Sequence, residues 1–179
     1  ILTMHFLLIC ALAVVYPLLH IFNAYAFKFA EISPHIGLIY LPAFLRLFNV
    51  MVLGAGAGTL ATMLGGVLLM WYFNDSTLVG LLNIACSAGG PLVAIFLFRI
   101  YFHRNYELTS LKDLTTIALI YAPANALLHH LMWSQLDPTQ LASPIQVLQM
   151  TFGDIFGALI GAYAMGFCMK WYERSRIDI

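Results

Sequence analysis

The sequence predicts an all-α protein, a polytopic membrane helix bundle of about six transmembrane helices, some of them kinked or broken, in a single integral membrane domain over residues 1–179. Hydrophobic residues make up 62% of the chain, charged residues make up 9%, and the mean hydropathy is +0.89. Soluble domains have roughly 45–50% apolar and about 25% charged residues. Apolar runs of helix length recur along the chain, and no alternating pattern typical of strands stands out.

Six apolar segments are expected to form the spans: Leu2–Phe27, Ile36–Leu53, Thr59–Phe73, Thr77–Phe98, Asp113–Trp133 and Pro144–Lys170. The second and third are short for a complete crossing, which takes about 20 residues, so a bent hairpin that does not fully cross is an open alternative. Between them, Gly54–Gly58 should form a flexible or tightly packed junction. The predicted kink sites are Pro42, Pro91 and Pro123, and the Ser87–Pro91 stretch is expected to kink the fourth span or open its backbone.

The chain carries little that points to catalysis or to nucleic acid. Eight basic and eight acidic residues cancel, so we expect no nucleic-acid partner. No nucleophile elbow, phosphate-binding loop or HExxH motif occurs, and no two carboxylates share one depth. The cysteines lie in apolar runs without CxxC spacing and are interpreted as packed side chains. We therefore expect no enzyme, no cofactor and no metal site.

The distribution of Lys and Arg predicts the orientation. The loop Arg99–Lys112 and the tail Lys170–Arg176 hold six of the eight basic residues, whereas the turns Asn74–Ser76 and Ser134–Ser143 hold none. Because cytoplasmic loops are enriched in Lys and Arg, both basic regions should be cytoplasmic. We expect a multi-pass protein of the bacterial inner membrane with a cytoplasmic C-terminus, whose partners are the lipid bilayer and other membrane or cytoplasmic subunits.

The last apolar segment combines a glycine ladder with one acidic residue. Gly153, Gly157 and Gly161 recur every fourth residue, so a helix places them on one face, where a neighbouring backbone can come close. Asp154 lies beside this face and inside the predicted span, where an unpaired charge is costly. We expect the glycines to pack against another element and Asp154 to have a polar partner.

Arg46 is the predicted partner of Asp154. If their helices begin at Ile36 and Pro144, both residues lie about 15 Å deep at 1.5 Å per residue, and a guanidinium can offer a carboxylate two parallel hydrogen bonds. Three interpretations stay open. The pair only fixes helix register; it lines a polar cavity or switches on ligand or proton binding; or the two never meet, with Arg46 reaching the cytoplasmic surface and Asp154 protonated.

Other polar residues inside the spans are weaker candidates. Adjacent His129 and His130 point about 100° apart on a helix, so they cannot both ligate one metal. We expect them at the outer membrane interface, in an aromatic belt with Trp133. His5 and His20 look isolated in the first span. Interhelical hydrogen bonds are expected for Asn49, Asn83, Asn125 and Gln149.

A series of short motifs runs through most of the chain, from residue 36 to residue 171. In order they are Ile36–Ala43, the glycine-rich Gly54–Gly58, Leu64–Gly66, Ala88–Val93 followed by Phe98-Arg99, Lys112–Leu114 and Phe152–Gly157. This series resembles the bacterial membrane-associated sensor domains of the MASE kind, type one. The resemblance implies a membrane sensing module that biases a cytoplasmic output, typically a histidine kinase or a cyclic-dinucleotide enzyme, with Pro42 and Asp154 at family positions.

We therefore expect a non-catalytic sensor-type module in which Asp154, with Arg46, lines the sensing cavity. The alternative is a small accessory subunit of a larger respiratory, photosynthetic or transport complex, whose glycine grooves and aromatic residues are contact surfaces. A third hypothesis, a substrate-binding transporter component, depends on broken helices at Pro91 and Pro123. A polar, solvent-connected cavity at Asp154 would favour the first or third hypothesis, and dry packing there would favour the second.

Overall fold

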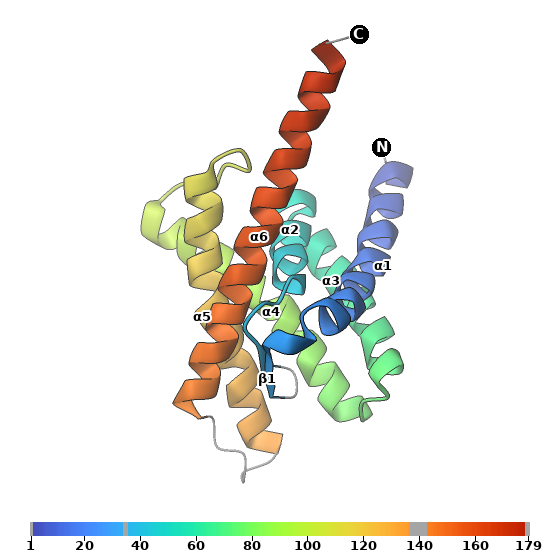
Figure 1. Ribbon diagram of the computed structural model, residues 1–179, viewed down its shortest axis with the longest axis vertical. Coiled ribbons are helices and arrows are strands. Elements are labelled where there is room, and N and C mark those ends of the chain that lie inside the picture. The colour runs from blue at the N-terminus through green and yellow to red at the C-terminus, as the bar shows by residue number, and fades with distance from the viewer. Residues whose placement is uncertain (1, 34–35, 137–142, 178–179) are drawn as a thin grey trace.

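The computed structural model describes residues 2–33, 36–136 and 143–177, which form a helix bundle with one small β-hairpin (Figure 1). The helices are α1 (Leu2–Ala26), α2 (Pro42–Leu53), α3 (Ala55–Phe73), α4 (Thr77–Phe102), α5 (Leu111–Leu136) and α6 (Pro144–Ile177). A short 3-10 turn, Lys28–Ala30, leads into the antiparallel strands β1 (Glu31–Ser33) and β2 (Ile36–Gly37). The all-α class is confirmed, and the sequence pattern predicted neither the 3-10 turn nor the hairpin.

The helices differ in their capacity to cross a membrane. By length and composition, four of those in the described residues are long and apolar enough to cross: α1, α3, α4 and α6. Helix α5 has 26 residues but is less apolar, and α2 has only 12. The chain is thus a membrane-embedded protein. Each of the six predicted spans corresponds to a helix, but α2 is shorter than the roughly 20 residues that a complete crossing takes.

The second predicted span is wrong in its first part. Ile36–Gly37 is a strand, and the helix starts only at Pro42. Proline suits the first helical position because it lacks the N–H that would be unsatisfied there and its φ is already helical. Pro42 therefore starts a helix and does not kink one.

The other two prolines lie inside uninterrupted helices. Pro91 lies within α4 and Pro123 within α5, and both helices run through without a break. The predicted opening of the backbone at Ser87–Pro91 is therefore wrong. In helix bundles of this kind, neighbouring helices and local adjustments satisfy the backbone groups that a proline frees.

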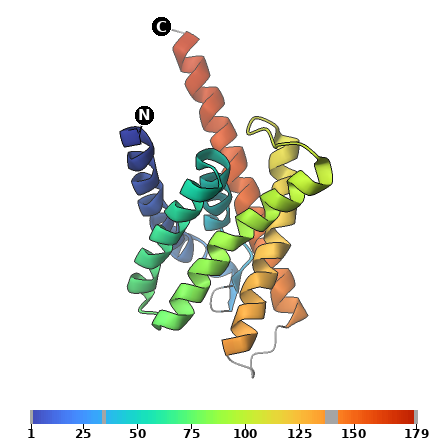
Figure 2. The same ribbon diagram turned by 180° about the vertical axis from the view of Figure 1, so that it is seen from behind.

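The elements alternate in direction between two ends of the bundle. Both chain termini and the α4–α5 loop lie at one end, which we call the terminal end, and the β-hairpin and the α3–α4 turn lie at the opposite end, the hairpin end (Figure 1). Figure 2 shows the same arrangement from behind. The loop Arg99–Lys112 thus shares an end with the C-terminus, as the predicted threading requires. The side chains of the basic tail and most of the turn Ser134–Ser143 lie outside the described residues.

Helix α2 is central, because it contacts all five other helices. It ends at Gly54, whose φ of +83° is a conformation that glycine adopts without strain. Helix α3 then folds back closely, since a Cβ on Gly58 would meet the Asn49 carbonyl. The Asn49 amide donates to the Thr62 hydroxyl at 3.1 Å. The predicted glycine junction is therefore a tightly packed turn, and the expected interhelical bond of Asn49 is present.

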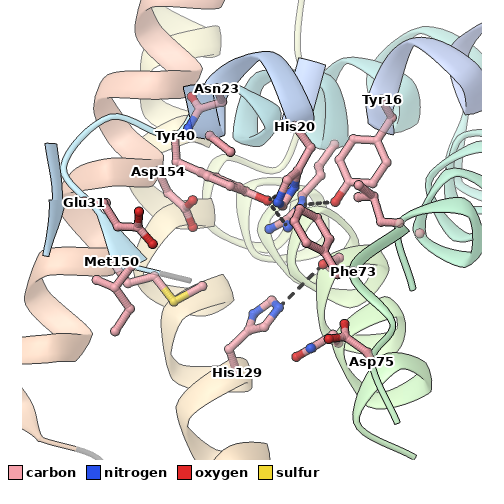
Figure 3. A pocket seen from close by; sticks show the side chains of 18 of the residues that line it. Tyr16, His20, Asn23, Glu31, Tyr40, Phe73, Asp75, His129, Met150 and Asp154 are labelled. Atoms are coloured by element: carbon pink, nitrogen blue, oxygen red, sulfur yellow. Dashed lines mark hydrogen bonds between the residues drawn. The ribbon is translucent and has the colours of Figure 1, made fainter. Parts of the chain in front are cut away.

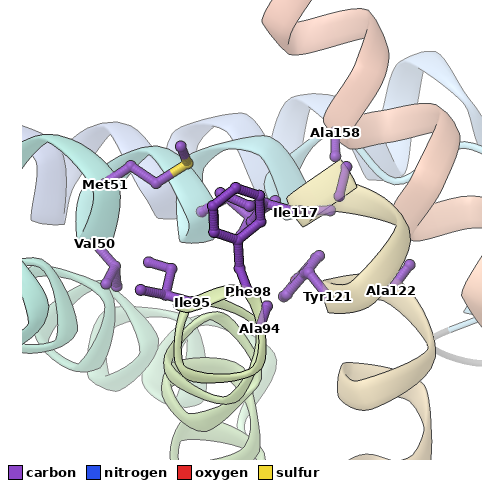
Figure 4. Close-up of a cluster of buried hydrophobic side chains, with 12 residues drawn as sticks. Val50, Met51, Ala94, Ile95, Phe98, Ile117, Tyr121, Ala122 and Ala158 are labelled. Carbon is purple, nitrogen blue, oxygen red and sulfur yellow. The ribbon is translucent and has the colours of Figure 1, made fainter. Parts of the chain in front are cut away.

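An apolar core fills the terminal half of the bundle. Its members come from α2, α4, α5 and α6, and Phe98, Ile117 and Tyr121 are completely buried within it (Figure 4). The later part of α2 and the later part of α4 face the early part of α5 there, as their alternating directions require. Because this half is packed with apolar side chains, the buried polar groups of the hairpin half form a separate region.

The α4–α5 loop is closed by an ion pair at the terminal end. Arg104 donates from both terminal nitrogens to the two Asp113 oxygens at 2.6 Å, and the Glu107 backbone N–H donates to the same carboxylate. The guanidinium, together with this N–H, lowers the pKa of Asp113 to about 2 although burial opposes the shift. Asp113 lies in the first turn of α5, so this ion pair joins the start of the helix to the polar loop that precedes it.

Candidate functional site: a cavity around Arg46 and Asp154

A cavity of about 270 Å³ occupies the hairpin half of the bundle (Figure 3). Every helix contributes to its wall, together with the stretch from β1 to Tyr40. Its rim carries exposed Lys28 and Glu31 and half-buried Asp75, and its interior carries the buried charges Arg46 and Asp154. The cavity therefore runs from a charged rim at the hairpin end to two charges inside the bundle.

Arg46 is held by three tyrosine hydroxyl groups. Its Nε donates to Tyr16 at 2.9 Å, Nη2 to Tyr40 at 2.8 Å, and Nη1 to Tyr121 at 3.5 Å. The guanidinium carbon also lies 5.7 Å from the Tyr16 ring centroid and 5.0 Å from that of Tyr40, within cation–π range. A guanidinium has five N–H donors. Two of them have no partner among the described residues, although only 4% of Arg46 is exposed.

Asp154 is buried on α6. Only 1% of the residue is exposed, and its Oδ2 accepts a hydrogen bond of 2.6 Å from the amide of Asn125, which is itself completely buried on α5. Within the described chain the other oxygen, Oδ1, receives no hydrogen bond, and Asp154 lines the cavity. Asn125 thus supplies the polar partner that Asp154 was expected to have.

Arg46 and Asp154 line one cavity but do not form the predicted ion pair. The ion pair present in the described residues is that of Arg104 and Asp113. The depth argument fails because α2 begins at Pro42, six residues later than the sequence pattern suggested. Arg46 does not reach the surface either, since three hydroxyl groups hold it inside. Of the three interpretations, the polar cavity agrees best with this geometry.

His20 belongs to the site although it looked isolated in the sequence. Its Nδ1 lies 2.9 Å from the Tyr40 hydroxyl. That hydroxyl accepts a hydrogen bond from Arg46. A guanidinium has no acceptor, so the hydroxyl can donate its own hydrogen bond to His20. His20 also contacts the Phe73 ring edge-on at 5.4 Å. The available sequence signal was spacing, because Tyr16 and His20 are four residues apart and share one face of α1.

The glycine ladder fixes the wall of the cavity. A Cβ on Gly153 or Gly157 would collide with the carbonyl of Gly37 or Tyr40, and one on Gly161 would collide with the Phe44 ring. The Tyr40 backbone N–H also donates to the Gly153 carbonyl at 3.1 Å. The predicted close packing is therefore present. Its partner is the stretch from Gly37 in β2 to Phe44 in α2, which carries the Tyr40 side chain into the site.

The two adjacent histidines are buried inside the bundle, and not in a lipid-facing aromatic belt as predicted. His129 is 3% and His130 5% exposed, and both rings contact Trp133, at 5.5 and 5.1 Å between centroids. The Trp133 indole donates to Asn83 at 2.9 Å, another of the expected interhelical bonds. His129 and Trp133 line the cavity. The contact with Trp133 was correctly expected, but it lies inside the bundle.

The arrangement suits noncovalent binding of a small molecule. Across the described residues no three His, Cys, Asp or Glu side chains gather as a metal site would need. The cavity instead offers one cation, one carboxylate, several hydroxyl and amide groups, and aromatic rings, which is the usual composition of a ligand pocket. Comparison of the chain with protein-family models, with curated proteins and with solved structures finds no match.

Proposed function

We propose that the chain is a non-catalytic, sensor-type membrane module that receives a small polar molecule in the cavity around Arg46 and Asp154. The observation that carries this proposal is the cavity itself, because buried charges without full partners are costly inside a bundle unless something binds them. The cavity opens at the hairpin end, so the molecule would enter from outside the cytoplasm of a bacterium. The terminal end would then face the cytoplasm.

Helix α6 supports transmission to a partner protein. It is one continuous helix of 34 residues that carries Asp154 in its hairpin-end half and runs beyond the other elements at the terminal end (Figure 1). At 1.5 Å per residue its length is about 51 Å, more than the roughly 30 Å of the hydrocarbon core. A change at the cavity would therefore reach the cytoplasmic side along a single element, where a kinase or a cyclic-dinucleotide enzyme is the kind of partner we expect.

A second function, the substrate-binding component of a transporter, is favoured by the same cavity. Its earlier basis, broken helices at Pro91 and Pro123, is absent, so the cavity is its only support. The accessory-subunit alternative has less support, because Asp154 lines a cavity.

The test is native mass spectrometry of the protein extracted gently from its own membrane. We expect the wild type to retain a small molecule in addition to lipid, and the Arg46→Gln and Asp154→Asn variants to lose it. Glu107→Gln, an exposed change in the α4–α5 loop, is the matched control and should retain it. Co-purification with a kinase or a cyclase would support sensing, and a permease partner would support transport. A wild-type protein that carries only lipid and sits in a large stoichiometric assembly would refute the ligand-binding role.

A further inference from the structure

The charges of the cavity point to the class of ligand, and this inference rests on the proposed function. We propose that the site binds a zwitterionic amino acid with an aromatic side chain, its carboxylate at Arg46 and its ammonium group at Asp154.

The first support is that each buried charge lacks part of its complement. The hydrogen bonds of Arg46 within the described residues go only to neutral hydroxyl groups, and two of its N–H donors have no partner there. Asp154 accepts one bond from Asn125 and has a second oxygen without a donor there. Charge-assisted bonds are about twice as strong as neutral ones. A ligand with one group of each sign would therefore satisfy both sites at once.

The second support is the overall charge of the lining. The lining contains two basic residues, Lys28 and Arg46, and three acidic residues, Glu31, Asp75 and Asp154. A phosphate or another polyanion would meet more repulsion than attraction there. A molecule with no net charge avoids this cost and still uses both interior charges.

The third support is the size and composition of the wall. At about 270 Å³, the cavity is near the lower end of the range for small-molecule sites. Aromatic rings from separate parts of the chain meet in its wall, among them Tyr16 on α1, Tyr40 between β2 and α2, Phe73 on α3 and Trp133 on α5. Aromatic rings favour stacked or edge-to-face contacts with one another. The body of the ligand is therefore expected to be a flat ring.

The experiment uses three probes that differ only in charge: L-tryptophan, tryptamine, which lacks the carboxylate, and indole-3-propionate, which lacks the ammonium group. Each is titrated calorimetrically into the full chain in lipid nanodiscs. We expect L-tryptophan to bind at least about tenfold more tightly than either analogue, because each analogue leaves one buried charge unpaired. Glycine should bind more weakly than L-tryptophan, because it lacks the ring.

Two variants assign the groups. Arg46→Gln should abolish the preference for L-tryptophan over tryptamine, and Asp154→Asn should abolish the preference over indole-3-propionate. The wild-type comparison does not depend on either variant folding. Equal binding of all three probes, or no binding at millimolar concentration, would overturn the inference. A different retained molecule in native mass spectrometry, such as a sugar, would overturn it while leaving the proposed function standing, whereas lipid alone would remove both.

Discussion

Arg46 can remain inside an apolar bundle because tyrosine hydroxyl groups accept hydrogen bonds that water would accept at the surface. Tyr16, Tyr40 and Tyr121 come from different parts of the chain, and their oxygens converge on one guanidinium. Tyr40 also links Arg46 to His20, since its hydroxyl accepts from Arg46 at 2.8 Å and lies 2.9 Å from His20 Nδ1. The site is therefore a network of polar side chains, in which losing one member leaves a buried donor unsatisfied.

Tyr40→Phe tests this network. The substitution keeps the ring but removes the acceptor of Arg46 Nη2, and an unsatisfied buried donor costs about 1–3 kcal/mol. We expect the free energy of unfolding, measured by denaturant titration in detergent, to fall by that amount. Tyr101→Phe is the control, because Tyr101 is 78% exposed and its variant should be unchanged. Equal stability of the two variants would contradict the role given to the Tyr40 hydroxyl.

Among the elements, α6 and the chain before α2 are joined by close backbone contact. The Tyr40 carbonyl lies directly against Gly157, and the Tyr40 N–H bonds to the Gly153 carbonyl. Such contact needs the absence of a Cβ, because a rigid backbone cannot move aside as a flexible side chain can. The ladder thus sets the position of Tyr40, and through it the position of one wall of the cavity.

Gly157→Ala is expected to destabilise the protein, because the added Cβ collides with the Tyr40 carbonyl. Overpacking of this kind costs about 1–3 kcal/mol. Gly166→Ala is the matched control on the same helix, since a Cβ there meets nothing within 4 Å. It should gain up to about 1 kcal/mol from the higher helix propensity of alanine. Unfolding free energies in detergent measure both, and a neutral Gly157→Ala would show that the ladder is loosely packed.

The sequence predicted those features that depend on neighbouring residues and missed those that depend on contacts between distant parts of the chain. Four-residue spacing predicted the face of Gly153, Gly157 and Gly161, and a charge in an apolar run singled out Arg46 and Asp154. The start of α2 was missed because an apolar run does not distinguish a strand from a helix over a few residues. The partners of Arg46 were missed because Tyr16, Tyr40 and Tyr121 are far apart in the sequence, and no spacing rule brings Tyr16 and Tyr121 together.

For the whole molecule, the two ends of the bundle differ in charge and in structure. The terminal end carries the ion pair of Arg104 and Asp113 and packs its interior with apolar side chains, whereas the hairpin end holds the cavity. This polarity gives the proposed orientation a direct test, because the α3–α4 turn and the α4–α5 loop must lie on opposite sides of the membrane.

We expect Ser76→Cys to react with a membrane-impermeant maleimide in spheroplasts, and Lys112→Cys to react only after permeabilisation. Both positions are exposed, and Cys10, Cys86 and Cys168 are first replaced by serine. The positive-inside rule places the basic loop in the cytoplasm. Labelling of Lys112→Cys in intact spheroplasts would show that the orientation is the reverse of the proposed one. The cavity would then be reached from the cytoplasm.

Under the proposed function, the length of α6 would make the glycine ladder a pivot. From Gly157 to Ile177 the helix runs twenty residues, or about 30 Å at 1.5 Å per residue. A rigid rod of that length that tilts by about 4° at the ladder displaces its far end by about 2 Å, the scale on which helices shift at interfaces during signalling. Under the proposed function, a ligand that moves Tyr40 by a fraction of an ångström would therefore displace the far end of α6 at the other membrane surface.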